Sequence, residues 1–215
     1  MVQRLAIVRL AAAIGVLAAC DGDIHDNREP PQGSPLRLIH LWYADGKDPP
    51  AQNPLCEHHR PPPFSCTFGS SLASCQAAVQ VYLDRWYRDL PVVFTLTAPP
   101  STTPHDTVVI STDGDWCGLV PAGLAPVTCE GLVQGTAWAF SCGDSAERCA
   151  AVIAQEHAHL LGLEHTNSPH DLLSMPICRD CVGFEDKEND VVLGRCRRVQ
   201  NSFELINQRI GSTHQ

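Results

Sequence analysis

The chain has 215 residues, of which 44% are hydrophobic and 18% charged, a composition that suits one globular domain with a substantial core. Twenty-four acidic against 15 basic residues give a net charge of −9, which excludes the broad basic surface of a nucleic-acid-binding protein. Eleven cysteines are unusual for a cytosolic protein and indicate an oxidising compartment.

The first 20 residues have the pattern of an export signal. Arg4 and Arg9 are followed by an apolar run over residues 10–19, which is too short to span a membrane. The segment 17–20 reads Leu-Ala-Ala-Cys and resembles the lipobox of bacterial lipoproteins, in which the cysteine is acylated. An ordinary signal peptide that ends near a chance cysteine is the alternative.

The lipobox predicts a mature chain that begins at Cys20. Residues 1–19 would be removed as the signal peptide, which leaves 13 basic and 24 acidic residues and a net charge of −11. Residues 20–35 have no apolar periodicity and predict a flexible tether. Because several acyl chains give durable anchoring, we expect a membrane-anchored lipoprotein of the cell envelope.

The rest of the chain, residues 36–215, predicts one domain in which strands and helices follow one another. Segments rich in β-branched and aromatic residues predict strands at 36–43, 92–97, 107–111 and 136–141. Apolar residues at helical spacing predict helices at 71–89, 145–161 and 202–210, with Ser70 or Ser71 capping the first and Asp144 or Ser145 the second. This order is typical of an α+β or α/β fold.

Ten cysteines remain if Cys20 is lipidated, enough for five disulfides whose pairing the sequence leaves open. Cys178 and Cys181 form a CxxC pair, which can serve in zinc or redox sites. Since no second CxxC is present and the context is not thioredoxin-like, structural disulfides are the better interpretation.

The end of the second predicted helix carries the most specific motif, QEHAHLLGLEH over residues 155–165. It resembles the HExxHxxGxxH signature of the metzincin zinc proteases, the matrixin and astacin clan, except that Gln155 stands in place of the first histidine. Ser174-Met175-Pro176, ten residues further on, looks like the Met-turn of the same clan.

The spacing agrees with this resemblance. Residues 155 and 159 are four apart, so their side chains lie about 40° apart around a helix and share one face. Gly162 allows the sharp turn that would bring His165 back to the same point.

The resemblance implies a mixed twisted sheet with two long helices, a zinc helix, a Met-turn and a small irregular C-terminal subdomain. It implies zinc as the cofactor, bound by His159, His165 and the residue at position 155, with Glu156 as the general base. Met175 would lie beneath the metal as a hydrophobic floor. Peptide or protein substrates would lie extended beside the strand at 136–141, and we expect a monomer.

Position 155 leaves three hypotheses open, because a neutral amide oxygen is a poorer zinc ligand than an imidazole. Gln155 can serve as a weak third ligand in a working endopeptidase. Alternatively, a loop residue fills the position, with His170, Asp171 and His105 as the candidates. In the third hypothesis the metal site has degenerated and the fold acts as a binding module.

A second possible metal site is the acidic run at 185–190, in which closely spaced carboxylates could hold calcium. The run lacks the regular EF-hand pattern, so we expect a solvated turn there.

Overall fold

Five strands form a single sheet in the computed structural model, which describes residues 36–51, 60–118, 121–132, 134–178 and 180–212. The order across the sheet is β2-β1-β3-β5-β4. The bounds of these strands are β1 Arg37–Tyr43, β2 Val92–Thr95, β3 Asp106–Ile110, β4 Gly123–Leu124 and β5 Thr136–Ala139. Four strands run parallel, whereas β4 pairs antiparallel with β5 at one edge.

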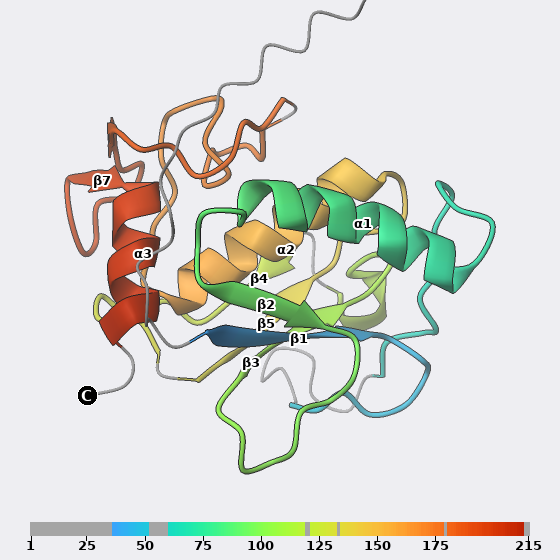
Figure 1. Cartoon of the computed structure of the whole chain (residues 1–215). Coiled ribbons are helices and arrows are strands. Elements are labelled where there is room, and N and C mark those ends of the chain that lie inside the picture. The colour runs from blue at the N-terminus through green and yellow to red at the C-terminus, as the bar shows by residue number, and fades with distance from the viewer. Residues whose placement is uncertain (1–35, 52–59, 119–120, 133, 179, 213–215) are drawn as a thin grey trace, which may run out of the picture.

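Two helices, α1 Leu72–Trp86 and α2 Ala146–Leu160, cover the same face of this sheet (Figure 1). Ser71 caps α1 in a capping box with Ser74, and the Ser145 side chain caps α2 by accepting a hydrogen bond from the Arg148 N–H. Such caps satisfy N–H groups that have no partner within the helix, which explains why each helix begins where it does.

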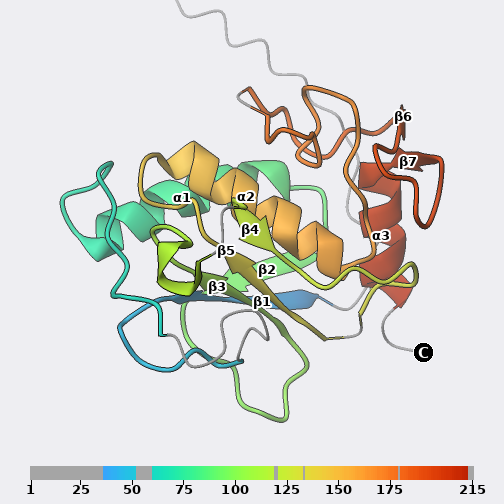
Figure 2. The ribbon, with the colours of Figure 1, turned by 180° about the vertical axis from the view of Figure 1, so that it is seen from behind.

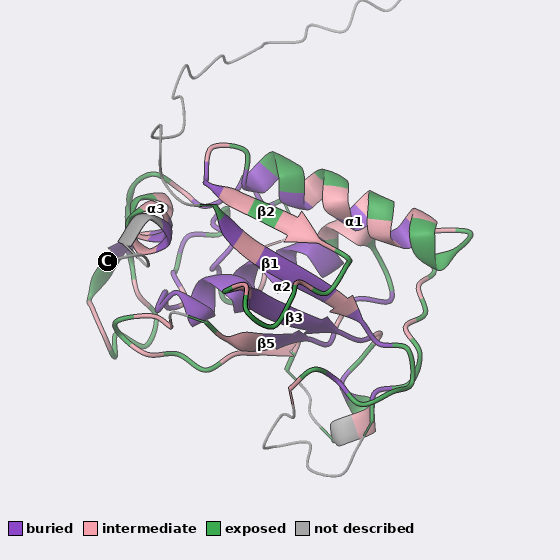
Figure 3. Cartoon of the chain, turned by 60° about the horizontal axis from the view of Figure 1, so that its bottom comes forward, coloured by how far each residue is buried: buried purple, intermediate pink, exposed green. Residues whose placement is uncertain are grey.

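The core lies on both faces of the sheet. In the central strand β3, Val108 and Ile110 pack towards the helices, whereas Val109 packs on the opposite face with Trp138 and Phe140. This alternation follows from the two-residue period of a strand, and full burial is typical of a central parallel strand. Figure 3 shows the resulting burial of β3 and α2.

Helix α2 is the most deeply placed helix, and every residue from Cys149 to Leu160 is buried. It contacts α1, β3, β4 and β5, and in the view from behind β4 lies alongside it (Figure 2). The polar side chains of α2 therefore need partners inside the protein.

The C-terminal part is mostly irregular between α2 and the last helix, α3 Ser202–Ser212. Two short strands, β6 Glu188–Asp190 and β7 Val199–Asn201, pair antiparallel in a second, two-stranded sheet. Ile206 and Ile210 anchor α3 to the main core. The acidic run at 185–190 is therefore partly a strand, whereas we expected only a solvated turn.

Structural disulfides, as expected from the sequence, join eight of the cysteines. The bridges are Cys66–Cys75, Cys129–Cys196, Cys142–Cys149 and Cys178–Cys181. The CxxC pair is thus a local bridge. Cys56 and the side chain of Cys117 lie outside what the structure describes.

Over the described residues the architecture is mixed α/β, with a mostly parallel sheet and three helices, as the sequence predicted in outline. The predicted strands and helices are present with shifted ends, but the sequence missed β4, β6, β7 and the short 3-10 helix Asp115–Cys117. These elements have two or three residues each, too few for a periodic pattern. The predicted signal, Cys20 and tether lie outside the described residues, and within the described part no helix is long and apolar enough to cross a membrane.

Candidate active site

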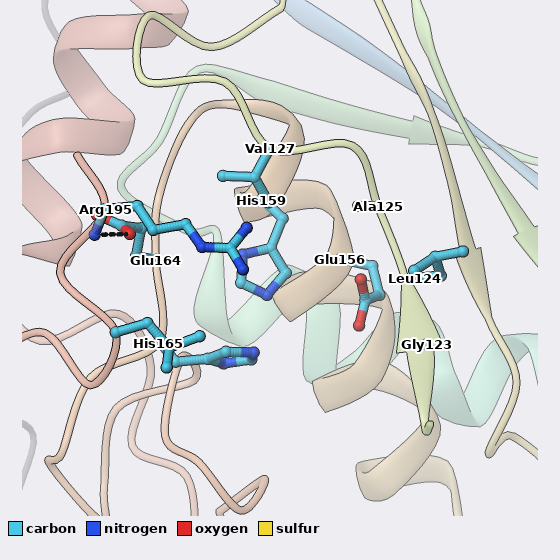
Figure 4. A pocket seen from close by; sticks show the side chains of 10 residues that line it. Gly123, Leu124, Ala125, Val127, Glu156, His159, Glu164, His165 and Arg195 are labelled. Carbon is cyan, nitrogen blue, oxygen red and sulfur yellow. Dashed lines mark hydrogen bonds between the residues drawn. The ribbon is translucent and has the colours of Figure 1, made fainter. Parts of the chain in front are cut away.

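A cavity of about 210 Å³ lies between β4 and the C-terminal end of α2. Glu156, His159 and His165 all line it (Figure 4). The walls are formed by Gly123, Leu124, Ala125 and Val127 on one side and by Glu164 and Arg195 on the other, and Leu193 also lines the cavity. The fold thus brings three of the predicted site residues together in one pocket.

His159 is held in one orientation by its own helix end. Its Nδ1 atom lies 2.8 Å from the carbonyl oxygen of Leu163. Since a carbonyl only accepts hydrogen bonds, Nδ1 carries the proton and Nε2 keeps a free lone pair. Burial, with the nearby ring of His165, lowers the pKa of His159 to about 4. The ring is therefore neutral at pH 7, the form in which histidine binds a metal.

His165 approaches His159 because the chain reverses at Gly162. Gly162 has a φ of 81°, and a Cβ there would lie 2.5 Å from the Thr128 carbonyl oxygen, so only glycine fits this turn. The two imidazole rings lie 4.6 Å apart between centroids and 83° apart in plane. The Nδ1 atom of His165 is buried without a well-formed hydrogen bond. Burial also lowers its pKa, although the Leu173 carbonyl partly opposes this.

Glu156 is one of two glutamates that line the pocket, and it is only 5% exposed. Burial raises its pKa to about 8. Gly123 of β4 makes room for it, because a Cβ at that position would lie 2.5 Å from Oε1 of Glu156. At pH 7 a carboxyl with this pKa is mostly protonated, and a cation held nearby would favour the carboxylate form that a general base needs.

Gln155 does not line the pocket. Its Nε2 atom donates to the carbonyl oxygens of Leu172 at 3.0 Å and Ser174 at 3.1 Å. The side chain therefore ties α2 to the turn that precedes Met175, a contact that the sequence did not predict.

The residues fit a zinc ion in part. The neutral ring of His159 and the imidazole of His165 are suitable donors, but the side chain of Gln155 is held by its hydrogen bonds to the carbonyls of Leu172 and Ser174. Among the residues that the structure describes, no group of three His, Cys, Asp or Glu side chains could hold a metal. The donor set is thus one protein ligand short of the three that catalytic zinc sites use.

None of the alternative third ligands lies in the pocket. His105 is hydrogen-bonded to the Thr103 carbonyl at 2.7 Å, and His170 lines a different cavity beside Cys178. The carboxylate of Asp171 accepts the backbone N–H groups of Leu173 and Glu185. Within the described part of the chain, none of these three candidates replaces Gln155.

Two expectations about the surroundings of the site are wrong. Met175 is 58% exposed and forms no floor, whereas Leu172 and Leu173 of the same turn are fully buried. The strand at 136–141 does not border the cleft, because β5 lies between β3 and β4. The edge of the pocket is instead Gly123–Leu124 of β4.

Glu164, which sequence reasoning did not single out, fixes the opposite wall. Its carboxylate accepts backbone N–H groups from Arg195 at 2.8 Å, Cys196 at 2.9 Å and Arg197 at 3.2 Å. Gln200 adds two hydrogen bonds to the backbone of Glu164. A glutamate inside the motif gives no sign in the sequence that it anchors a segment more than 30 residues away.

The other flank of α2 carries a buried charge network. His157 contacts Asp106 at 3.2 Å and the Tyr87 hydroxyl at 3.0 Å. Arg37 forms two hydrogen bonds with the Asp106 carboxylate, at 2.6 and 2.9 Å. This network fixes the rotation of α2 about its axis, so Glu156 and His159 face the pocket.

Comparisons with known proteins leave the family of the chain open. No family model matches the sequence, and no curated protein is similar to it at a significant level. Among solved structures, the chain is similar to archaemetzincin from Methanopyrus kandleri at 13% sequence identity and a TM-score of 0.42. The match covers 84% of this chain and 98% of that one. We draw no functional conclusion from a likeness with this TM-score.

Proposed function

We propose that the chain is a metzincin-type zinc endopeptidase whose active site is the pocket beside β4. The observation that carries the proposal is the meeting of Glu156, His159 and His165 in one pocket, at the spacing of the metzincin signature. The neutral state of His159 and the closeness of its ring to that of His165 also support it.

His159 and His165 would hold the zinc, and Gln155 would leave the third position without a strong protein ligand. When bound, zinc polarises a peptide carbonyl and lowers the pKa of water. With two imidazoles alone, zinc affinity is expected to be well below that of a three-histidine site.

Glu156 would take up the proton released by the attacking water and return it to the leaving amine. Its burial beside Gly123 keeps bulk water away and holds the carboxyl in one place. Strand β4 pairs with β5 on one side only, and no described strand pairs with its other side. An extended peptide could add to that edge through backbone hydrogen bonds.

The second candidate is a binding module that has lost its metal. The engaged amide of Gln155 favours it, because this side chain already satisfies two buried carbonyls and stabilises the fold without zinc. In that case the pocket and the β4 edge would bind peptides without cleaving them.

The lipobox that we propose would place the protein in the cell envelope, whether it is a peptidase or a binding module. Anchored through Cys20 by a tether of residues 20–35, the domain would meet exported peptides or proteins in the cell envelope.

The test is cleavage of an internally quenched peptide library by the purified, processed protein in zinc-buffered solution. We expect cleavage that Glu156→Gln abolishes while zinc uptake is retained, because Glu156 is not a ligand. The control is Glu188→Gln, which changes an exposed glutamate on β6 and should leave cleavage unchanged. Equal cleavage by Glu156→Gln and the unaltered protein would refute the mechanism.

A further inference from the structure

Arg195 is the one lysine or arginine among the described residues that line the pocket. It is exposed, and its side chain extends from the wall opposite β4 towards the side of the pocket where His159 lies (Figure 4). Glu156 lies on the far side of His159 in the same view. The pocket therefore combines a proton acceptor and a fixed positive charge at opposite ends.

The guanidinium of Arg195 has no hydrogen bond or ion pair within the described part of the chain. Two nearby arginines behave differently. Arg197 donates to the side chain of Gln200 and to the Cys129 carbonyl, and Arg209 donates to the carbonyls of Cys129 and Glu130. Those two arginines hold the fold together, whereas the five N–H donors of Arg195 remain available to a ligand.

The backbone of Arg195 is nevertheless fixed. Its N–H group and those of the next two residues bind the Glu164 carboxylate. The neighbouring Cys196 is bridged to Cys129, in the loop that follows β4. An exposed arginine on a tethered backbone loses less freedom on binding than one on a loose loop, which favours recognition of an anion.

We infer that Arg195 is a specificity-determining residue that binds a carboxylate of the peptide next to the bond to be cleaved. The position of the cleaved bond rests on the proposed function, whereas the binding of a carboxylate by Arg195 does not. A guanidinium pairs with a carboxylate through two parallel hydrogen bonds. Both the terminal carboxylate of a peptide and an aspartate or glutamate side chain supply this chemistry.

The experiment measures equilibrium binding of fluorescent peptides to the metal-free, processed protein by fluorescence anisotropy. Three peptides with the same apolar sequence are compared. The first ends in a free carboxylate and the second in an amide. The third also ends in an amide but carries one internal aspartate. We expect at least one carboxylate peptide to bind about 10- to 100-fold more tightly than the plain amide, the range for a charge-assisted hydrogen-bonded pair.

Arg195→Gln should remove this preference, because it keeps the backbone bonds to Glu164 and loses the charged guanidinium. Arg198→Gln is the matched control, since Arg198 is an exposed arginine three residues away that does not line the pocket. It should keep the preference. Tighter binding of the acid peptide points to a terminal carboxylate, and tighter binding of the aspartate peptide to a side chain.

Equal binding of all three peptides by the unaltered protein would overturn the inference, as would a preference that survives Arg195→Gln. Absence of saturable binding of every peptide would also overturn it. Failure of the proposed function is a separate result: a protein that neither takes up zinc nor cleaves peptides, yet prefers carboxylates through Arg195, would refute the peptidase and keep the carboxylate site.

Discussion

Single side chains decide what this pocket can do, and Gly123 is the clearest example. The side chain of Glu156 occupies the space that a side chain at position 123 would need, because a Cβ there would lie 2.5 Å from Oε1 and 2.5 Å from Cγ of that glutamate. Neither histidine is among the nearest atoms to such a Cβ. Position 123 therefore acts on Glu156, the proposed proton acceptor, and not on the two histidines proposed to bind the metal.

Gly123→Ala is expected to reduce kcat/KM for peptide cleavage by about tenfold or more, since displacement of a general base removes much of its contribution. Zinc affinity, measured by competition with a chelating dye, should stay within about twofold of the unaltered protein. Parallel losses of cleavage and zinc affinity would mean that the substitution disturbs the whole pocket, contrary to this prediction.

The buried carboxylate of Asp106 makes the stability of the fold depend on pH. Burial alone would raise its pKa, but the hydrogen bonds and charges of His157 and Arg37 bring it below the ordinary value of 3.8. The folded state thus binds fewer protons than the unfolded chain. The stabilisation is fully present above pH 3.8 and is lost as the pH falls through the lower folded pKa.

Asp106→Asn should therefore flatten the acid side of the stability profile, measured as the free energy of unfolding in urea. At neutral pH it should cost about 3–5 kcal/mol, because Arg37 stays buried without its carboxylate. Asp84→Asn, at an exposed site on α1, should change stability by no more than about 0.5 kcal/mol. If Asp106→Asn left the pH dependence of the free energy of unfolding unchanged at acid pH, this explanation would be contradicted.

At the scale of elements, the disulfides constrain very different lengths of chain. Cys129–Cys196 spans 67 residues and joins the loop after β4 to the wall that carries Arg195. Cys178–Cys181 spans three residues and closes only a local turn. The entropy that a bridge removes from the unfolded chain grows with the length it encloses.

Replacing both cysteines of the long bridge by serine should lower the free energy of unfolding by about 4 kcal/mol, against under about 2 kcal/mol for the short bridge. Guanidinium unfolding of the two double variants beside the unaltered protein provides the comparison. Similar losses from both, or a larger loss from the short bridge, would show that local packing outweighs chain entropy here.

The elements also show what the sequence can and cannot predict. Helix α2 was predictable because Ser145 caps it, apolar residues recur along it and Gly162 ends it. The pairing of His159 with His165 followed from the motif. Strand β4 was not predictable, because its two residues form a strand only through pairing with β5.

Contacts between a side chain and a distant backbone group also escaped prediction, because they too depend on the tertiary fold. The Glu164 carboxylate binds N–H groups 31 to 33 residues away, and Gln155 binds carbonyls 17 and 19 residues away. No local pattern records such partners. The motif likewise placed a turn at Met175 but could not fix which of its side chains would be buried.

At the scale of the whole molecule, the lipobox that we propose at residues 17–20 would determine where the domain works. Cys20→Ser should block acylation and leave the precursor unprocessed or release the protein from the membrane fraction. Fractionation with immunoblotting and mass spectrometry of the N-terminus checks both outcomes. Normal processing together with membrane retention of the variant would show that the Leu17–Cys20 segment is not a lipobox.

The central claim is that the pocket is a metzincin-type zinc site weakened at position 155. An imidazole at position 155 could donate one N–H to the carbonyl of Leu172 or Ser174, which Gln155 now satisfies. Its second nitrogen would then be left for the metal. His159 already has this arrangement, with one ring nitrogen bonded to the Leu163 carbonyl. Gln155→His should therefore complete a three-histidine set.

The most direct measurement is the zinc dissociation constant of the processed protein and of its Gln155→His variant in metal-buffered solution. We predict zinc binding by the unaltered protein that His165→Ala removes. Binding should be at least about 10- to 100-fold tighter in Gln155→His, since that range is typical of changes to residues that only support zinc ligands. Zinc affinity that is the same in all three proteins would contradict the claim, because position 155 and His165 would then not face the metal.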